Sequence, residues 1–314
     1  ATTRLNIGEL RNTGFEVTLE STNIQNKNFT WSSSFNIAFN KNKILSLNYG
    51  QEQMTSYISW DQKFRNQIAY VSRVGESAGK MYGFVYDGTY KEEDFNITVN
   101  ENGKKTYELK PGVPKFKDGC QPGDPKYKNI DGSEDNLITD NDRTVIGNGH
   151  PLHTGGFTNN FVYKNWDLNI FLQWSYGNDV FNVNRLVMEN PGAKKQLNQF
   201  ASYKNRWSES NPTSNIPRVR AVGADEYSSL YVEDGSFLKL KTISLGYNFD
   251  TKTLKRIGLS AARVFVSAEN IATITGYSGS DPEVSTRHSV LTPGFDWSAY
   301  PRAFNASLGV NVTF

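Results

Sequence analysis

The last eleven residues of the chain, FNASLGVNVTF, alternate strictly between two kinds of side chain. The even positions are apolar and the odd positions are polar or glycine; the apolar ones are Phe304, Ala306, Leu308, Val310, Val312 and Phe314. A period of two is typical of a β-strand with one apolar face and one polar face. Such an apolar face is covered either by a protein core or by lipid, and this choice constrains the fold more than any other feature.

The same alternation recurs along the chain, whereas helical periodicity is scarce. It is found in FEVTLES (15–21), FTWSSSFNIAFN (29–40), WDLNIFLQW (166–174) and ISLGYNF (243–249), and more weakly in RVFVSAEN (263–270). In residues 29–40, Ser33 is the only polar side chain on the otherwise apolar face. The pattern predicts an all-β, antiparallel protein.

Aromatic side chains lie at the ends of these strands. Residues 166–176 run from Trp166 to Trp174 and Tyr176. At about 3.3 Å per residue and a tilt near 40°, ten steps rise roughly 25 Å, which is the height of the lipid-facing band of an outer-membrane barrel. Such barrels carry aromatic girdles at both edges of that band. In a soluble sandwich we would expect aromatic residues at the middle of a strand at least as often as at its ends.

The connections between the predicted strands alternate in length. Residues 26–28 and 164–165 are tight turns, and 250–261 make a modest one, whereas about 48–155, 177–235 and 271–303 are long, irregular and rich in Gly, Pro, Asn and Asp. Compact soluble domains rarely have such long loops, whereas outer-membrane barrels join short periplasmic turns to long extracellular loops. With residue 314 on the periplasmic side, every short turn lies inside and every long stretch outside. We therefore predict that residues 1–314 belong to one transmembrane β-barrel domain.

The composition agrees with this prediction. The chain has 314 residues, of which 13% are aromatic, and its mean hydropathy is −0.57. No stretch of about 18 apolar residues is present, so no transmembrane helix is expected, and a barrel with a polar lumen has an average hydropathy like that of a soluble protein. The net charge of +2, with acidic and basic residues interspersed, gives no nucleic-acid-binding footprint.

Soft metal ligands are few. Cys120 is the single cysteine, which rules out an internal disulfide and argues against a Cys-based zinc site. His150 and His153 in HPLH lack a third ligand at a suitable spacing, and we interpret them as ordinary loop residues.

Eight stretches resemble the SusC/RagA family of TonB-dependent outer-membrane transporters of Bacteroidetes, and they occur in the family's order from one end of the chain to the other. They are GELRNTGFEV (8–17), YGFVYDGTYKEEDF (82–95), PGDPKYKNIDG (122–132), ITDNDRTVIGN (138–148), PLHTGGFTNNFVYKNWDLNIFLQWSYGNDVFN (151–182), YVEDGSFLKLKTISLGYNF (231–249), TGYSGSDPEV (275–284) and GFDWSAYPRAFNASLGVNVTF (294–314).

The resemblance implies a 22-stranded barrel in the bacterial outer membrane, closed by an N-terminal plug. It implies import of oligosaccharides or peptides, driven through TonB, together with a SusD-like surface lipoprotein that closes over the lumen as a lid. We expect this chain, which opens on ATTRLNIG, to be the C-terminal portion of such a barrel, without the TonB box, the plug and the early strands. Its last strand would close the barrel against a first strand outside the chain, and a terminal Phe resembles the barrel-assembly signal.

Two other functions share some of these features. A passive porin or structural outer-membrane barrel has the same strands and loops, and only the plug and TonB box separate it from an active transporter. A secreted soluble β protein that binds or cleaves glycans would instead cover the apolar face with other protein.

The turn DGSEDNLITDND (131–142) has the spacing of a calcium-binding loop. Position 1 is an Asp, positions 3 and 5 are Ser and Asp, a carbonyl is available at position 7 and another Asp stands at position 12, which gives the candidate ligands Asp131, Ser133, Asp135, Leu137 and Asp142. Asn136 replaces the usual glycine, and the final Asp is shorter than the usual Glu. We predict Ca²⁺, or alternatively Mg²⁺, as a loop-ordering ion; the other interpretation is an acidic surface loop with Asp-Gly turns.

Catalysis is not expected. A serine-hydrolase elbow, a phosphate loop and a dinucleotide fingerprint are missing from the sequence. The acidic pairs Glu233-Asp234 and Asp225-Glu226 do not form a glycosidase site by themselves, because neighbouring residues on a strand point to opposite faces.

Ligand contacts are expected from two groups of residues. Aromatic side chains of the long connections can stack on sugars or pack against a partner, or can equally hold these connections together; they are Tyr82, Phe84, Tyr86, Tyr90, Trp207, Tyr227, Tyr231 and Trp297. Polar residues predicted to face the lumen suit sugars and peptides equally; they include Asn36, Asn169, Gln173 and Asn311.

Overall fold

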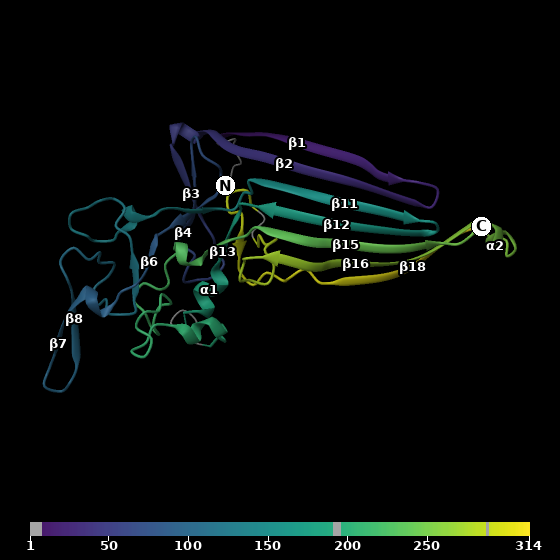
Figure 1. Ribbon diagram of the computed structural model, residues 1–314. Helices are drawn as coiled ribbons and strands as arrows, with labels where there is room; N and C mark the ends of the chain where they lie inside the picture. Colours follow the sequence, from purple (N-terminus) through teal and green to yellow (C-terminus); the bar gives the residue numbers. More distant parts are fainter. Residues whose placement is uncertain (1–7, 191–195, 287–288) are drawn as a thin grey trace.

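A computed structural model describes residues 8–190, 196–286 and 289–314 (Figure 1). Long strands run side by side across one part of the molecule, and shorter strands and loops gather at one end of them. Among the described residues, no helix is long and apolar enough to cross a membrane.

The long strands form one seven-stranded sheet in which each strand is antiparallel to its neighbours. In spatial order, which is also chain order, they are β1 (Gly8–Gln25), β2 (Phe29–Leu47), β11 (His153–Tyr163), β12 (Trp166–Tyr176), β15 (Phe237–Asn248), β16 (Ala261–Thr275) and β18 (Asn305–Thr313). The all-β, antiparallel prediction is confirmed, and β16 is longer than its sequence pattern indicated. β11 was not recognised by its alternation, because Gly155 and Asn159 interrupt its apolar face.

Three short turns lie at the same end of the sheet as the C-terminus (Figure 1). In the first, Asn26 Oδ1 accepts hydrogen bonds from the backbone N–H groups of Asn28 and Phe29, at 3.1 and 2.9 Å. In the second, Lys164 adopts a positive φ of 53°. The third contains α2 (Thr251–Lys255), whose first turn is capped by the side chain of Asp250. The predicted tight turns are therefore present.

The connections at the opposite end fold into a body that we call the loop domain, the described residues within 48–152, 177–236 and 276–303. Its strands are β3 (Gln53–Tyr57), β4 (Ile68–Arg73), β5 (Lys80–Gly83), β6 (Tyr86–Thr89), β7 (Phe95–Val99), β8 (Lys105–Leu109), β9 (Pro125–Tyr127), β10 (Thr144–Asn148), β13 (Asp179–Asn182), β14 (Val232–Asp234) and β17 (Phe295–Asp296). They make four small sheets, ordered β10-β5-β4-β3, β14-β13-β17, β6-β9 and β7-β8.

Helical structure in the loop domain is short. α1 spans Val183–Met188, and 3₁₀ turns span Asn48–Gly50, Glu92–Asp94, Asp140–Asp142, Ala201–Asn205 and Ser229–Tyr231. The prediction that these connections are irregular was wrong for the stretches that form strands and helices. The strands are two to six residues long, which is too short for a period of two to stand out from the surrounding turn residues.

Buried apolar residues from all three connections pack together in the loop domain. The largest cluster consists of Ile58, Phe64, Ala69, Tyr70, Met81, Phe181, Val183, Leu186, Val187, Tyr227, Tyr231 and Phe295. Removing these side chains from water stabilises the fold. The loop domain therefore has a core of its own, at one end of the long sheet.

Candidate functional site

The strand registers give the long sheet one apolar face. Residues directly opposite each other on antiparallel strands point to the same side of a sheet. One row of such partners crosses six strands through Leu19, Phe35, Phe157, Leu172, Leu240 and Ala272. A second row crosses five strands through Phe161, Leu168, Leu245, Val266 and Leu308. The apolar positions of the separate strands thus merge into one continuous surface.

Aromatic rings border this apolar face at both ends. Near the short turns, Trp31 stacks on Phe161 with ring centroids 5.7 Å apart, and Trp166 packs on Tyr247 at 4.8 Å. Near the loop domain, the rings of Phe15, Phe39, His153 and Tyr176 form a contiguous series, with centroids 4.7, 5.4 and 5.1 Å apart. Two aromatic borders around an apolar band are typical of the lipid-facing surface of an outer-membrane barrel.

The apolar face is open. Leu308 is 78% exposed and Leu19 62% exposed, because no other described residue covers them. Contiguous exposed apolar surface on this scale marks contact with a membrane or with another protein.

The other face of the sheet is polar. One row contains Asn36, Gly156, Gln173, Lys239 and Thr273, and another contains Thr22, Ser32, Asn160, Asn169, Ser244, Ser267 and Ser307. Asn169 Nδ2 donates a hydrogen bond to Asn160 Oδ1 at 2.7 Å, and Asp167 pairs with Arg263 at 2.5 Å. The four polar residues predicted to share the lumen side do lie on this one face. It offers hydrogen-bonding groups to water or to a polar solute.

A cluster of charges joins the polar face to the loop domain. Lys239, only 1% exposed, places Nζ 3.3 Å from Asp281 Oδ1 and 2.5 Å from Glu283 Oε2. Glu283 also pairs with Arg302 at 3.3 Å and, more distantly, with Lys241 at 3.8 Å. These ion pairs fasten the third connection, residues 276–303, onto the polar face. This buried charge network was missed from the sequence, because Lys239 is more than forty residues from both Asp281 and Glu283.

Asp281 remains ionised in this cluster. Burial raises the pKa of its carboxyl, but the backbone N–H groups of Glu283 and Arg302 and the ammonium of Lys239 outweigh this, so the pKa lies below its usual value. Two clefts of about 440 and 420 Å³ adjoin the cluster, and both are lined by Glu283 and Arg302. The cluster thus presents charged and hydrogen-bonding groups to solvent-filled space on the polar side.

The predicted calcium ligands do not converge in the structure. Asp142 is fully buried; its Oδ1 accepts from the N–H of Ile130 and of Asp131, at 2.7 and 3.2 Å, and its Oδ2 from that of Thr139 at 2.8 Å. Asp131 accepts from the N–H of Ser133, and Asp135 from the N–H of Leu137, so both stabilise the turn locally.

Over the part of the chain that is described, no three His, Cys, Asp or Glu side chains are placed to hold a metal ion together. Asn136 has a φ of 52°, the left-handed conformation in which calcium loops use glycine. In the arrangement seen here, the carboxylates of Asp131, Asp135 and Asp142 accept hydrogen bonds from the backbone of the turn and do not form an oxygen cage. Ca²⁺ or Mg²⁺ in this turn stays a prediction.

The two histidines have separate partners. His150 Nε2 lies 3.1 Å from the carbonyl oxygen of Ala78. His153 Nδ1 accepts a hydrogen bond from Trp174 Nε1 at 3.1 Å, and its ring stacks on Tyr176. The interpretation as an ordinary loop residue agrees with the place of His150, but it was wrong for His153, which is the first residue of β11.

The acidic pairs considered as glycosidase residues are likewise engaged in ion pairs. Glu233 pairs with Arg185 at 3.1 Å, and Glu226 with Arg143 at 3.0 Å and with Lys117 at 3.0 Å. They connect strands and loops within the loop domain.

Four of the eight loop aromatics are core residues. Phe84, Tyr90, Tyr227 and Tyr231 are at most 2% exposed and belong to the apolar clusters. Tyr90 Oη donates to the carbonyl of Pro114 at 2.5 Å. For these four, the alternative that they hold the connections together is the one that the structure supports. The others are partly exposed; they are Tyr82, Tyr86, Trp207 and Trp297.

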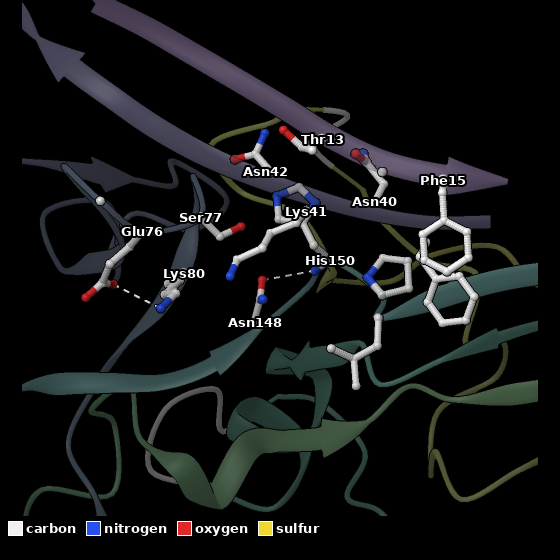
Figure 2. Close-up of a pocket in the computed structure, with 15 residues that line it drawn as sticks. Thr13, Phe15, Asn40, Lys41, Asn42, Glu76, Ser77, Lys80, Asn148 and His150 are labelled. Atoms are coloured by element: carbon white, nitrogen blue, oxygen red, sulfur yellow. Dashed lines mark hydrogen bonds and ion pairs between the residues drawn. The ribbon is translucent and has the colours of Figure 1, made fainter.

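A larger cleft lies where β1 and β2 approach the loop domain (Figure 2). It encloses about 770 Å³ and is lined by residues within four stretches of the chain, 13–15, 39–42, 75–80 and 148–152. Phe15 lies at one end, and Glu76 and Lys80 lie at the other. The sequence pattern of residues 29–40 ends just before Lys41 and gave no sign of this cleft. From the tight turn at residues 26–28, the sequence indicates that β1 and β2 pair with each other. It does not indicate that the loop domain lies beside them.

Comparison with known proteins identifies relatives. No family model matches the chain. Over 98% of its length it is 34% identical to TonB-dependent receptor P3 of Formosa agariphila and 29% identical to TonB-dependent receptor SusC of Bacteroides thetaiotaomicron. The solved structure of the RagAB peptide transporter superposes on 98% of the chain with a TM-score of 0.69 and 23% identity. The resemblance to SusC/RagA receptors and the all-β fold are confirmed. The chain spans 29% and 27% of the two receptors and 30% of the solved chain.

Proposed function

We propose that this chain, similar to TonB-dependent receptors of the SusC type, is part of the wall of an outer-membrane β-barrel that imports oligosaccharides or peptides. One observation carries the proposal: the long sheet has an apolar face with aromatic borders and a polar face, and all its short turns lie at one end. This is the arrangement expected of a wall between lipid and a water-filled lumen.

The edges of the sheet support a barrel larger than this segment. β1 and β18 are the edge strands, and each has one neighbour in the described chain. An open edge in lipid leaves backbone N–H and C=O groups without partners, at a cost of several kcal/mol for each group. We infer that further strands of the same receptor pair with both edges and close the barrel.

The loop domain occupies the extracellular side in this proposal, and the short turns and C-terminus the periplasmic side. Its folded core makes it a firm platform for a second protein. A SusD-like surface lipoprotein is the proposed partner, docking on the loop domain over the polar lumen. TonB would act through another part of the receptor, and we assign no bond-making or bond-breaking chemistry to this segment.

Two classes of solute suit the polar face. Its amide and hydroxyl groups can bind sugar hydroxyls or peptide groups, and the exposed guanidinium of Arg302 can bind the carboxylate end of a peptide. The RagAB complex with this fold is a peptide transporter.

Uptake measured in cells tests the proposal. Cells that make the whole receptor and its lipoprotein would be given labelled oligosaccharides and labelled peptides, with TonB present or deleted. We expect accumulation of one of the two classes, and its loss without TonB. Uptake that persists without TonB would indicate a passive porin. A wild-type receptor that stays in solution without detergent would indicate a secreted soluble β protein.

A further inference from the structure

A group of cations continues the apolar face beyond its aromatic border. In the β1–β2 hairpin, Phe15 is opposite Phe39, Thr13 is opposite Lys41, and Arg11 is opposite Lys43. The register is regular from Leu10 to Thr22, so these residues all lie on the apolar side of the sheet. We call Arg11, Lys41 and Lys43 the rim cations.

The rim cations form no ion pair within the described residues, although the carboxylate of Glu9 lies two residues from Arg11 on the same side of β1. Arg11 and Lys43 are directly opposite each other, so their Cβ atoms are about 5 Å apart. Like charges in such a pair repel each other and destabilise the sheet. All three are exposed, and none forms an ion pair with a described carboxylate. The nearest acidic residue of the adjoining cleft, Glu76, is paired with Lys80 at 3.0 Å. An anion supplied from outside the chain would relieve this repulsion.

The rim cations lie at the level expected for lipid headgroups. Lys43 is four residues beyond Phe39, which is about 13 Å along a strand and roughly 10 Å along the membrane normal at a tilt near 40°. Aromatic borders mark the interface between hydrocarbon and headgroups. Cations just beyond such a border are in reach of the phosphates of the outer leaflet.

The adjoining cleft suits an amphiphile. Figure 2 shows Phe15 at one end of the cleft, the Glu76–Lys80 ion pair at the other, and Lys41 near Asn148 between them. The rings of Phe15 and Phe39 are stacked, and Leu152, which also lines the cleft, is 62% exposed. The end with Phe15 therefore offers apolar surface to an acyl chain, while the part of the cleft with Lys41 and Asn148 offers a cation and an amide to a phosphate.

The cations are confined to the β1–β2 side of this border. At the loop-domain end of the other described strands, the apolar face carries neutral residues, among them His153, Tyr176, Leu238 and Ile274. Ile274 is 72% exposed. The charge is thus a local feature of one hairpin and not a general property of the sheet.

We propose that the rim cations and the cleft beside them bind a phosphate-bearing lipid of the outer leaflet. Arg11 contacts the phosphate from β1 and Lys43 contacts it from β2, on the same face of the sheet, and Lys41 contacts it from the cleft. The acyl chain lies on Phe15 and Phe39. This rests on the proposed function, since it requires the apolar face to lie in lipid.

Lipid titration of the whole receptor tests the proposal. The variant is Arg11→Gln with Lys43→Gln; the matched control is Lys252→Gln with Lys255→Gln in α2, which removes two exposed cations at the opposite end of the sheet. Purified receptor in neutral detergent would be titrated with phosphatidylglycerol and, separately, with inorganic phosphate, and bound molecules counted by native mass spectrometry. We expect phosphatidylglycerol binding to weaken about fivefold for each rim cation removed, as for one cation at an anionic membrane surface, and to stay unchanged in the control.

Other outcomes would overturn the proposal. Equal lipid binding by the rim variant and the wild type would show that these cations hold no lipid. Inorganic phosphate binding as tightly as the lipid would assign the site to a free anion. Unchanged lipid binding together with loss of the co-purifying lipoprotein would assign it to a protein partner. Resistance of the folded barrel to SDS confirms that the variant folds, and TonB-dependent uptake by the same variant tests the proposed function separately.

Discussion

Arginine substitutions on the two faces of β12 distinguish a membrane wall from a soluble sheet. Ile170 lies on the apolar face, where its partner on β15 is Ile243, and it is four residues from both Trp166 and Trp174. Its neighbour Asn169 lies on the polar face. We expect Ile170→Arg to prevent stable assembly in a membrane and Asn169→Arg to be tolerated.

The expected loss of stability depends on how deep in the membrane the substituted residue lies. Four residues correspond to about 13 Å along the strand and roughly 10 Å along the membrane normal, so Ile170 is near the middle of the apolar band. An arginine facing lipid at the midplane costs about 2–4 kcal/mol, which lowers the ratio of folded to unfolded protein by about 30- to 1,000-fold. Asn169→Arg loses one hydrogen bond, to Asn160, at about 1 kcal/mol.

Denaturant unfolding of the receptor in lipid vesicles, followed by tryptophan fluorescence, measures both values. The fraction of each variant that reaches the outer membrane in cells gives a second readout. Equal destabilisation by the two substitutions, or a larger effect of Asn169→Arg, would refute the assignment of the apolar face to lipid.

Other expected outcomes concern the loop domain. Lys239→Met leaves Asp281 and Glu283 without their buried cation, at a cost of about 3–5 kcal/mol; residues 276–303 should be cleaved faster in limited proteolysis, and equal cleavage would contradict this. Because the folded-state pKa of Asp281 is lowered, its contribution is complete above its unfolded pKa and is lost as the pH falls through the folded value. The hydrogen-exchange protection factors of the described residues in 276–303, which are observed rates corrected for the intrinsic pH dependence of exchange, should therefore be constant from pH 5 to 7 and fall below about pH 4; a fall that begins above pH 5 would contradict it. Asp142→Ala leaves three backbone N–H groups without an acceptor, at about 1–3 kcal/mol each if they stay buried, and should accelerate cleavage within 131–142. Calcium titration by calorimetry tests the ion prediction for that turn: heat that disappears in Asp131→Asn would support it, and no heat would oppose it.

The long strands were predictable because their signal is local. A period of two follows from the geometry of an extended chain, so β12 and β18 could be recognised from about ten residues each. The turns at residues 26–28 and 164–165 were also predictable from the sequence, because each is a short polar stretch between two alternating stretches. The structure shows turn conformations at Asn26 and Lys164. β11 was missed where glycine and asparagine occupy positions on its apolar face.

The loop domain could not be derived in the same way. Tyr90 and Tyr227 have no sequence neighbours that distinguish a core residue from an exposed ligand-binding aromatic. Tyr90 is buried by residues up to 30 positions away in its own connection, and Tyr227 by residues of the other two connections. For the 131–142 turn, the sequence shows only the spacing of the oxygen-bearing residues. The direction of each carboxylate, toward its own backbone N–H groups, depends on the folded turn.

The sequence by itself determined that this protein has two-faced antiparallel strands, joined alternately by short turns and long connections, and it carried the resemblance to SusC/RagA receptors. Both follow from the order of residues along the chain. The tertiary structure decided which rows of side chains merge into one apolar and one polar face, how the connections bury a common core, and that Arg11 stands opposite Lys43 above the aromatic border. These three features depend on strand register and on contacts between segments that are distant in the sequence. Burial and charge repulsion arise between side chains that meet only when the chain has folded.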